Sequence, residues 1–341
     1  MVKMMINKIY VYIKDIIKRN LWFFIGLLVI LLLTVVKIPY EVMMPGGTID
    51  LTDRISIDGE EVDLEGSFNM AYVTVIQGNI PYTLVASVLP DWDVEKMSTE
   101  TYDKDTVEQE NMINRLYLQG SKFSAKKAAF DQAGIAYEMG DEHSYVTSLD
   151  KKAKSDLKVG DDITKVNGKK VKNTNDILGI VKDLKVGDKI TLEVIRDKKT
   201  IEVNTEIIDL NGEPKMGVSV LSMAEIDTDI DIEINSKDSE SGPSGGMMMA
   251  LMIYNAITDQ DLTHGKKVVG TGTIESDGSV GMIGGIKYKV MGAAKSKADI
   301  FLVPEGNYKE AVEIKKKKGY DIEIVSVKTL SDAIKYLEGL K

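Results

Sequence analysis

The sequence of 341 residues contains no cysteine, and this absence removes several chemistries at once. Without a thiol there is no cysteine nucleophile, no disulfide bond and no cysteine-based zinc site. Histidine is nearly as scarce, with His143 and His264 the only two. Each lies in a polar, loop-like stretch, so a serine–histidine–aspartate triad lacks a base, and no H-E-x-x-H motif is present. The sequence therefore predicts no metal site and no cofactor.

The chain also lacks the motif G-x-x-x-x-G-K-[ST], so no ATP-driven step is expected. Its net charge is −10. Residues 1–40 hold six basic residues and one acidic residue, a charge of +5, which leaves −15 on residues 41–341. A surface with that excess of negative charge repels nucleic acid and anionic lipid. Nucleic-acid binding is therefore excluded.

One long run, Leu21–Val36, carries no charge. Extended to Ile38 it approaches the ~20 residues that cross a bilayer. No small-residue cleavage site follows, which disfavours a cleaved signal peptide. We therefore expect a transmembrane helix at residues 21–38. The basic excess in residues 1–20 predicts a cytoplasmic N-terminal segment, a single-pass cell-membrane protein and an extracellular location for everything that follows.

Residues 41–133 predict a β-rich and helical membrane-proximal region, with short strands followed by a charged helix from about Asp103 to Gly134. This helix carries Ser124 and Lys127 in the spacing S-x-x-K. The companion S-D-N and K-T-G motifs of penicillin-binding enzymes are absent. We expect an ordinary solvated helix here.

Residues 134–210 combine short strands, turns and one helix. Leu157–Gly168 has the pattern L-K-x-G-D-x-I-x-x-V-N-G, ending in a hairpin turn at Asn167 and Gly168, and a helix is expected over 173–184. The region resembles a PDZ domain, although its loop before this pattern departs from the usual S-P-A-x-x-A-G. The resemblance implies an exposed sheet edge beside a helix, where an extended peptide adds as a strand. A small closed β-domain without a groove is the alternative.

Ser244 lies in Ser-Gly-Pro-Ser-Gly-Gly (241–246), directly ahead of the apolar run Met247–Ile257. Such a turn presents a hydroxyl, and the start of a helix offers backbone N–H groups to a developing oxyanion. A glycine-rich turn that merely caps a helix has the same composition. A second glycine-to-helix junction, G-G-I-K-Y-K at 284–289, supplies the base that a serine needs, if burial lowers a lysine pKa towards neutrality.

The two motifs together resemble the Ser-Lys dyad of the Lon-type serine endopeptidases, whose patterns are G-P-S-A-G and P-I-G-G-φ-K-x-K. The resemblance implies that Ser244 is the nucleophile. It implies that Lys289 is the base, four residues after Gly285. Thr271 matches the threonine of T-G-E-I and is expected to support the lysine by a hydrogen bond. The resemblance spans roughly 225–341.

The chain departs from the Lon pattern at three places. Ser241 stands where Lon usually has aspartate, with Glu240 one residue earlier. Gly245 replaces alanine, and Thr273 replaces the glutamate of T-G-E-I. None of these positions removes either member of the dyad.

The complete order, with a proteolytic domain at 215–341, resembles the membrane-anchored, PDZ-containing Lon-type serine endopeptidases of Gram-positive bacteria. The resemblance implies an α+β multidomain fold and an ATP-independent hydrolase that cleaves extracytoplasmic peptides or unfolded protein segments. Lon-type domains commonly form rings, so a homo-oligomer is expected. The alternative is a catalytically silent, membrane-tethered adaptor that binds peptides.

Overall fold

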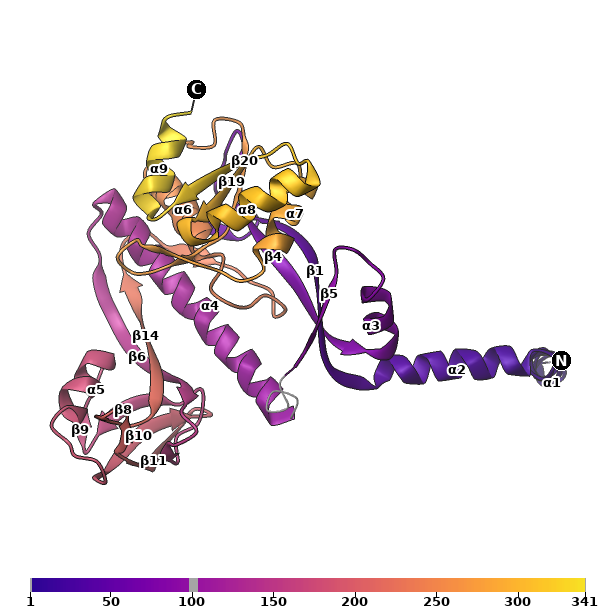
Figure 1. The fold of residues 1–341 in the computed structure, drawn as a ribbon, viewed down its shortest axis with the longest axis horizontal. Coiled ribbons are helices and arrows are strands. Elements are labelled where there is room, and N and C mark those ends of the chain that lie inside the picture. The colour runs from indigo at the N-terminus through magenta and orange to yellow at the C-terminus, as the bar shows by residue number, and fades with distance from the viewer. Residues whose placement is uncertain (1, 98–103, 341) are drawn as a thin grey trace. The chain divides into compact units, whose positions relative to one another are not determined.

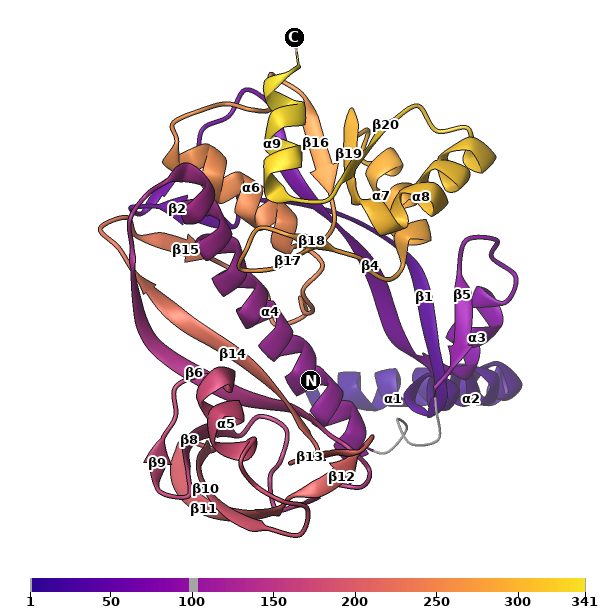
Figure 2. The same ribbon diagram turned by 60° about the vertical axis from the view of Figure 1, so that its left-hand side comes forward.

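The computed structural model describes residues 2–97 and 104–340 (Figures 1 and 2). The chain divides into two compact units, Met1–Met44 with Thr74–Asp103, and Pro45–Val73 with Lys104–Lys341. Strands β1 (Lys37–Asp50) and β4 (Ser67–Asn79) each contribute residues to both units.

The first unit contains the predicted anchor. Its elements are α1 (Val2–Arg19), α2 (Leu21–Val35), the first half of β1, the end of β4, α3 (Ile80–Ala86) and β5 (Asp93–Lys96). Strand β5 pairs antiparallel with Tyr40–Met43 of β1.

Helix α2 ends three residues before the predicted end of the span at Ile38. The chain turns into strand β1 at Lys37, and Pro39 disfavours a helical conformation at the residue before it. No single helix in the described part of the chain is both long and apolar enough to cross a bilayer. Met5–Arg19 and Leu21–Val35 together meet that test of length and composition, with a bend of 83° between them.

A mostly parallel sheet lies at the centre of the second unit. Its strands follow the order β20-β19-β16-β4-β1, with parallel pairing from β4 to β20. The additional strands are β16 (Lys267–Gly270), β19 (Ile300–Pro304) and β20 (Glu323–Val327).

Helices cover both faces of this sheet. Val268 and Leu302 pack in a core with α6 (Gly246–Ile257), whereas Val269 and Phe301 pack with α7 (Ile286–Lys295) and α8 (Glu305–Lys318). Because successive side chains of a strand point to opposite faces, strands buried on both sides are apolar throughout. The sequence predicts an α+β fold, but this domain has the layered α/β arrangement.

Helix α4 (Lys104–Ala133) follows the predicted helix closely, and its predicted start at Asp103 lies outside the described residues, as do positions 98–102. One of its faces is buried, so it is not the ordinary solvated helix that was predicted. The face of α4 that carries the small residues Ala125, Ala128 and Ala129 is buried in one core with α6 and α9 (Leu330–Glu338). Residues 45–73 and 104–133 therefore fold in the same unit as the predicted proteolytic domain.

The predicted PDZ-like region forms an antiparallel sheet in the order β14-β6-β8-β10-β11-β7, with helix α5 beside it. The elements are β6 (Glu138–Leu149), β7 (Lys154–Ser155), β8 (Asp162–Val166), β9 (Lys169–Lys170), α5 (Thr174–Val181), β10 (Lys189–Arg196), β11 (Lys199–Glu206) and β14 (Val218–Asp227). Asn167 and Gly168 make the predicted turn, both with positive φ. Asn173 caps α5 by accepting hydrogen bonds from two backbone N–H groups.

Two details of this region differ from the sequence prediction. Helix α5 ends at Val181 rather than at Leu184. Strand β14 lies beyond the predicted domain end at residue 210, yet it pairs with β6 over almost its full length. The remaining short strands are β2 (Ile55–Ile57), β3 (Glu60–Glu61), β12 (Ile208–Leu210), β13 (Glu213–Lys215), β15 (Ile232–Ile234), β17 (Thr273–Ile274) and β18 (Val280–Gly281).

Candidate active site

Ser244 lies in a tight turn directly before helix α6. Gly242 has a φ of +83°, which favours glycine, and the N–H of Gly246 closes the turn on the carbonyl of Pro243 at 3.1 Å. Helix α6 then runs into the core with its first ten residues buried. The turn is thus fixed at one end by a buried helix, while Ser244 itself is half-exposed.

The carbonyl of Ser244 is held by two donors from the strand end after β16. The N–H of Gly272 donates to it at 2.8 Å and the hydroxyl of Thr271 at 3.0 Å. Thr271 is completely buried. The predicted contact was with Lys289, but the described hydrogen bond of the Thr271 side chain goes to Ser244. Thr271 therefore orients the serine backbone.

Helix α4 supports the same turn from another side. The hydroxyl of Ser121 donates to the carbonyl of Pro243 at 3.2 Å, and the N–H of Gly242 donates to the carbonyl of Asn114 at 2.9 Å. Sequence reasoning missed both contacts, because their partners lie more than one hundred residues apart and no local pattern links them.

Glu240 anchors the loop that leads to Ser244. Its carboxylate accepts from Arg54 Nη2 at 2.7 Å and from the N–H of Lys237 at 3.0 Å. The Arg54 and Glu240 side chains are 15% and 17% exposed, so water screens this ion pair less than a surface pair. These two contacts of the Glu240 carboxylate therefore restrict the conformation of the loop before Ser244.

Lys289 lies in the first turns of α7, after Gly285 at the helix cap. Gly285 has a φ of +69°, and the N–H of Lys289 bonds to its carbonyl at 3.2 Å. The lysine is 4% exposed, and this burial, which disfavours the charged form, lowers its pKa to about 8. Lys287 is different, because its ammonium group lies over the ring of Tyr288 at 5.1 Å. The burial of Lys289 therefore favours a neutral amine.

Strand β4 is approached closely by both glycine junctions, from its two opposite faces. A side chain at Gly245 would contact Met70, and a side chain at Gly285 would contact Val73, so each junction approaches the strand closely. Met70 and Val73 are three residues apart, about 10 Å along a strand. The Ser244 turn and the start of the Lys289 helix therefore lie against the same short stretch of β4.

Gly246 of α6 lies close to both α4 and β17. A Cβ atom there would contact the Ser121 hydroxyl and would lie 2.7 Å from Cγ2 of Ile274. We expect Gly246→Ala to lower the free energy of unfolding by about 1–3 kcal/mol, measured by urea denaturation. Gly179→Ala is the control, because nothing lies within 4 Å of its added Cβ and alanine favours helix. Equal stability of the wild type and Gly246→Ala would contradict the tight packing.

The two histidines lie elsewhere. His143 Nδ1 is 2.7 Å from Oδ2 of Asp162 within the PDZ-like sheet, and His264 lies in the loop after α6 with a φ of 48°. The described residues contain no cluster of three acidic or histidine side chains that could hold a metal ion.

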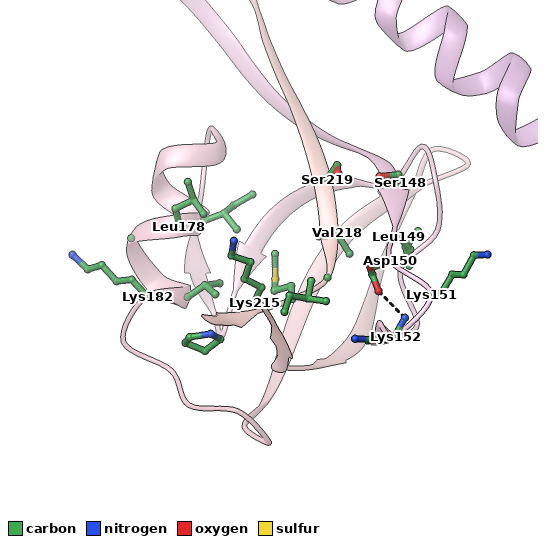
Figure 3. A pocket seen from close by; sticks show the side chains of 17 residues that line it. Ser148, Leu149, Asp150, Lys151, Lys152, Leu178, Lys182, Lys215, Val218 and Ser219 are labelled. Atoms are coloured by element: carbon green, nitrogen blue, oxygen red, sulfur yellow. Dashed lines mark hydrogen bonds between the residues drawn. The ribbon is translucent and has the colours of Figure 1, made fainter. Parts of the chain in front are cut away.

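A cavity of about 1070 Å³ lies between α5 and the start of β14 (Figure 3). Leu178 of α5 and Lys182, directly after α5, line it together with Val218 and Ser219 of β14. Among the strands that the structure describes, β14 lies at one edge of its sheet, and helix α5 lies beside the start of this strand. Four lysines stand around the cavity, one of which pairs with a glutamate at 2.7 Å: Lys151, Lys152, Lys182 and Lys215. The cavity therefore combines an apolar floor with a basic rim.

The structure thus joins an α/β domain, with a serine at the mouth of a buried helix, to an antiparallel sheet with an open groove. Residues 215–338 match the family described as the Lon protease (S16) C-terminal proteolytic domain, and residues 132–207 match the PDZ domain family. The chain carries a serine-peptidase domain of the Lon type and a PDZ domain.

Similar proteins share parts of this chain. The Lon protease of Campylobacter concisus (strain 13826) is 27% identical over 187 residues, which are 52% of this chain and 23% of that protein. The Lon protease of Mesomycoplasma hyopneumoniae (strain 232) is 34% identical over 90 residues, 26% of this chain and 10% of that protein. The matched stretches are thus less than a quarter of these relatives.

Among solved structures, the PDZ domain of the SdrC-like protein from Listeria monocytogenes is 23% identical, with a TM-score of 0.22. The matched region is 23% of this chain and 86% of that structure.

Proposed function

We propose that the chain is an ATP-independent serine endopeptidase in which Ser244 is the nucleophile and Lys289 the general base. The observation that carries the proposal is the burial of Lys289, which lowers its pKa to about 8 beside the strand that also holds the Ser244 turn. A serine hydroxyl is a weak nucleophile until a neighbouring base takes its proton. A neutral amine in this position supplies that base.

The reaction begins when Lys289 Nζ takes the proton of the Ser244 hydroxyl and Oγ attacks the scissile carbonyl carbon. The backbone N–H groups of Ser244 and Gly245 have no partner among the described hydrogen bonds, so we assign the oxyanion to them. The Met247 N–H, in the first turn of the helix, is bonded to the carbonyl of Gly272 instead.

The tetrahedral intermediate collapses to an acyl ester on Ser244, and the lysine ammonium returns its proton to the leaving amine. Lys289, neutral again, deprotonates a water molecule that attacks the ester. Collapse of the second intermediate releases the carboxylic acid product and restores the serine hydroxyl. Thr271 and Gly272 keep the Ser244 backbone in place during both steps through their hydrogen bonds to its carbonyl.

Turnover should depend on pH through Lys289. The amine acts as a base only when neutral, so kcat/KM should rise with pH through about 8 and level off above it. The measurement is a pH profile of the cleavage of an unstructured peptide, with the fold monitored by circular dichroism at each pH. A profile that is flat between pH 6 and 10, or one that falls through pH 8, would rule out Lys289 as the base.

For the substrate we propose peptides or unfolded protein segments presented by the PDZ groove. An extended segment could add to the open edge of β14 and place apolar side chains against Leu178 and Val218, with carboxylates near the lysine rim. Cleavage of such peptides should be the same with and without ATP. Tight peptide binding without any cleavage would favour the adaptor function instead.

We further propose that the apolar run Leu21–Val36 anchors the chain in a cell membrane and that catalysis takes place on its outer side. The support is the uncharged run itself, preceded by five basic residues and one acidic residue. A homo-oligomer, as in other Lon-type domains, stays a prediction.

A further inference from the structure

We propose that α3 and the turn after it insert into the surface of the lipid bilayer beside α2, and so give the chain a second membrane contact. The inference rests on the proposed anchor, because it requires α2 to lie in a bilayer. The partner is the lipid surface itself, bound through apolar side chains.

The segment from Asn79 to Pro90 contains no charged residue. Its large apolar side chains point outwards to an unusual degree, with Leu84 64% and Val88 78% exposed. Three more are between 37% and 48% exposed: Tyr82, Val85 and Leu89. Contiguous apolar surface of this kind marks an interaction site on a soluble surface or at a membrane.

This surface is continuous with that of α2. The side-chain amide of Asn79 donates to the carbonyl of Thr34, near the end of α2, at 3.0 Å. The same side chain accepts from the N–H of Tyr82 at 2.9 Å and so caps α3. Figures 1 and 2 both show α3 beside the end of α2 that leads into β1. One buried asparagine thus fixes the apolar segment next to the apolar helix.

The length of α2 explains why such a contact would be useful. Its 15 residues extend about 22 Å, whereas the hydrocarbon core of a bilayer is about 30 Å thick. A short span is accommodated by local thinning or by flanking groups that move into the interface. Exposed apolar side chains between residues 82 and 89, held at the end of the span, would lie in that interface, where tyrosine is common.

Charge does not account for membrane contact at this place. Residues 41–341 carry a formal charge of −15, which repels anionic lipid. Insertion must therefore come from burial of the apolar side chains, and it should not require anionic headgroups. This separates the proposal from electrostatic docking.

The absence of cysteine makes the test direct, because one introduced cysteine accepts one label. Single variants Leu84→Cys and Val88→Cys of the full chain are labelled with the environment-sensitive dye NBD and reconstituted into phosphatidylcholine vesicles. Leu28→Cys, in the middle of α2, reports on the anchor. Glu95→Cys, exposed on β5, is the matched aqueous control in the same unit. Emission maximum and quenching by lipids carrying a nitroxide near the headgroup are measured.

The proposal predicts blue-shifted emission and strong quenching at positions 84 and 88, with neither at position 95. Blue-shifted emission at 28 but aqueous emission at 84 and 88 overturns the second contact and leaves the anchor intact. Blue-shifted emission at 84 and 88 without lipid quenching also overturns it, because a protein surface then covers the segment. Aqueous emission at 28 as well refutes the anchor.

Discussion

Peptide hydrolysis should fall by about 10⁴-fold or more in Ser244→Ala, with the fold unchanged. The hydroxyl of Ser244 takes part in none of the described hydrogen bonds. The turn before α6 is held by the backbone carbonyl of Ser244, which the substitution leaves in place. Removing one oxygen from this half-exposed side chain should therefore change the free energy of unfolding by less than about 0.5 kcal/mol. The measurement is the turnover of an unstructured peptide, with a urea denaturation curve for each protein.

Ser124→Ala is the matched control, because Ser124 lies on α4 in the S-x-x-K spacing that the sequence also contains. Its hydroxyl is 3.4 Å from that of Ser276 and has no described contact with the Ser244 turn. Activity should be retained in this variant. Loss of activity in Ser124→Ala together with retention in Ser244→Ala would assign the chemistry to α4 instead.

Lys289→Met should abolish activity and at the same time stabilise the protein at neutral pH. Methionine fills a similar volume without a charge, and the site is 4% exposed. In the wild type the pKa of Lys289 is about 8 in the folded state against 10.5 ordinarily, a difference equivalent to about 3 kcal/mol. Below pH 8 the folded protein bears this cost of a buried charge, and the methionine variant does not.

The pH dependence of stability follows from the same pKa. Between about pH 8 and 10.5 the unfolded chain binds more protons at this lysine than the folded chain does. The free energy of unfolding of the wild type should therefore increase as pH rises through that window. The free energy of unfolding of Lys289→Met should not show this increase. Lys287→Met is the control. It should keep both the activity and the increase in the free energy of unfolding with pH. A Lys289→Met variant that is active, or less stable than the wild type at pH 7, would contradict this account.

Local features of the fold could be predicted from the sequence because they depend on neighbours in the chain. The turn at Asn167 and Gly168 and the extent of α4 both follow from residue types within a few positions. The serine turn and the lysine helix were found in the same way, because each motif is contiguous.

Long-range assembly could not be predicted in this way. Periodicity shows which face of an element is buried but not which element covers it. Phe68 in β4 pairs with Val268 in β16, two hundred residues later, and the Ser121 hydroxyl reaches Pro243. Contacts of this kind join segments that no local pattern of the sequence links. Thr271 donates to the carbonyl of Ser244, and this hydrogen-bond partner was not predictable from spacing.

The most direct test of the Ser244–Lys289 pair is covalent labelling with a fluorophosphonate followed by mass spectrometry of the digested protein. The account predicts one adduct, on Ser244, whose rate of formation rises with pH through about 8. It predicts that the rate falls sharply in Lys289→Met and is unchanged in Lys287→Met. An adduct on another residue, or labelling of Ser244 at the same rate when Lys289 is replaced, would contradict it.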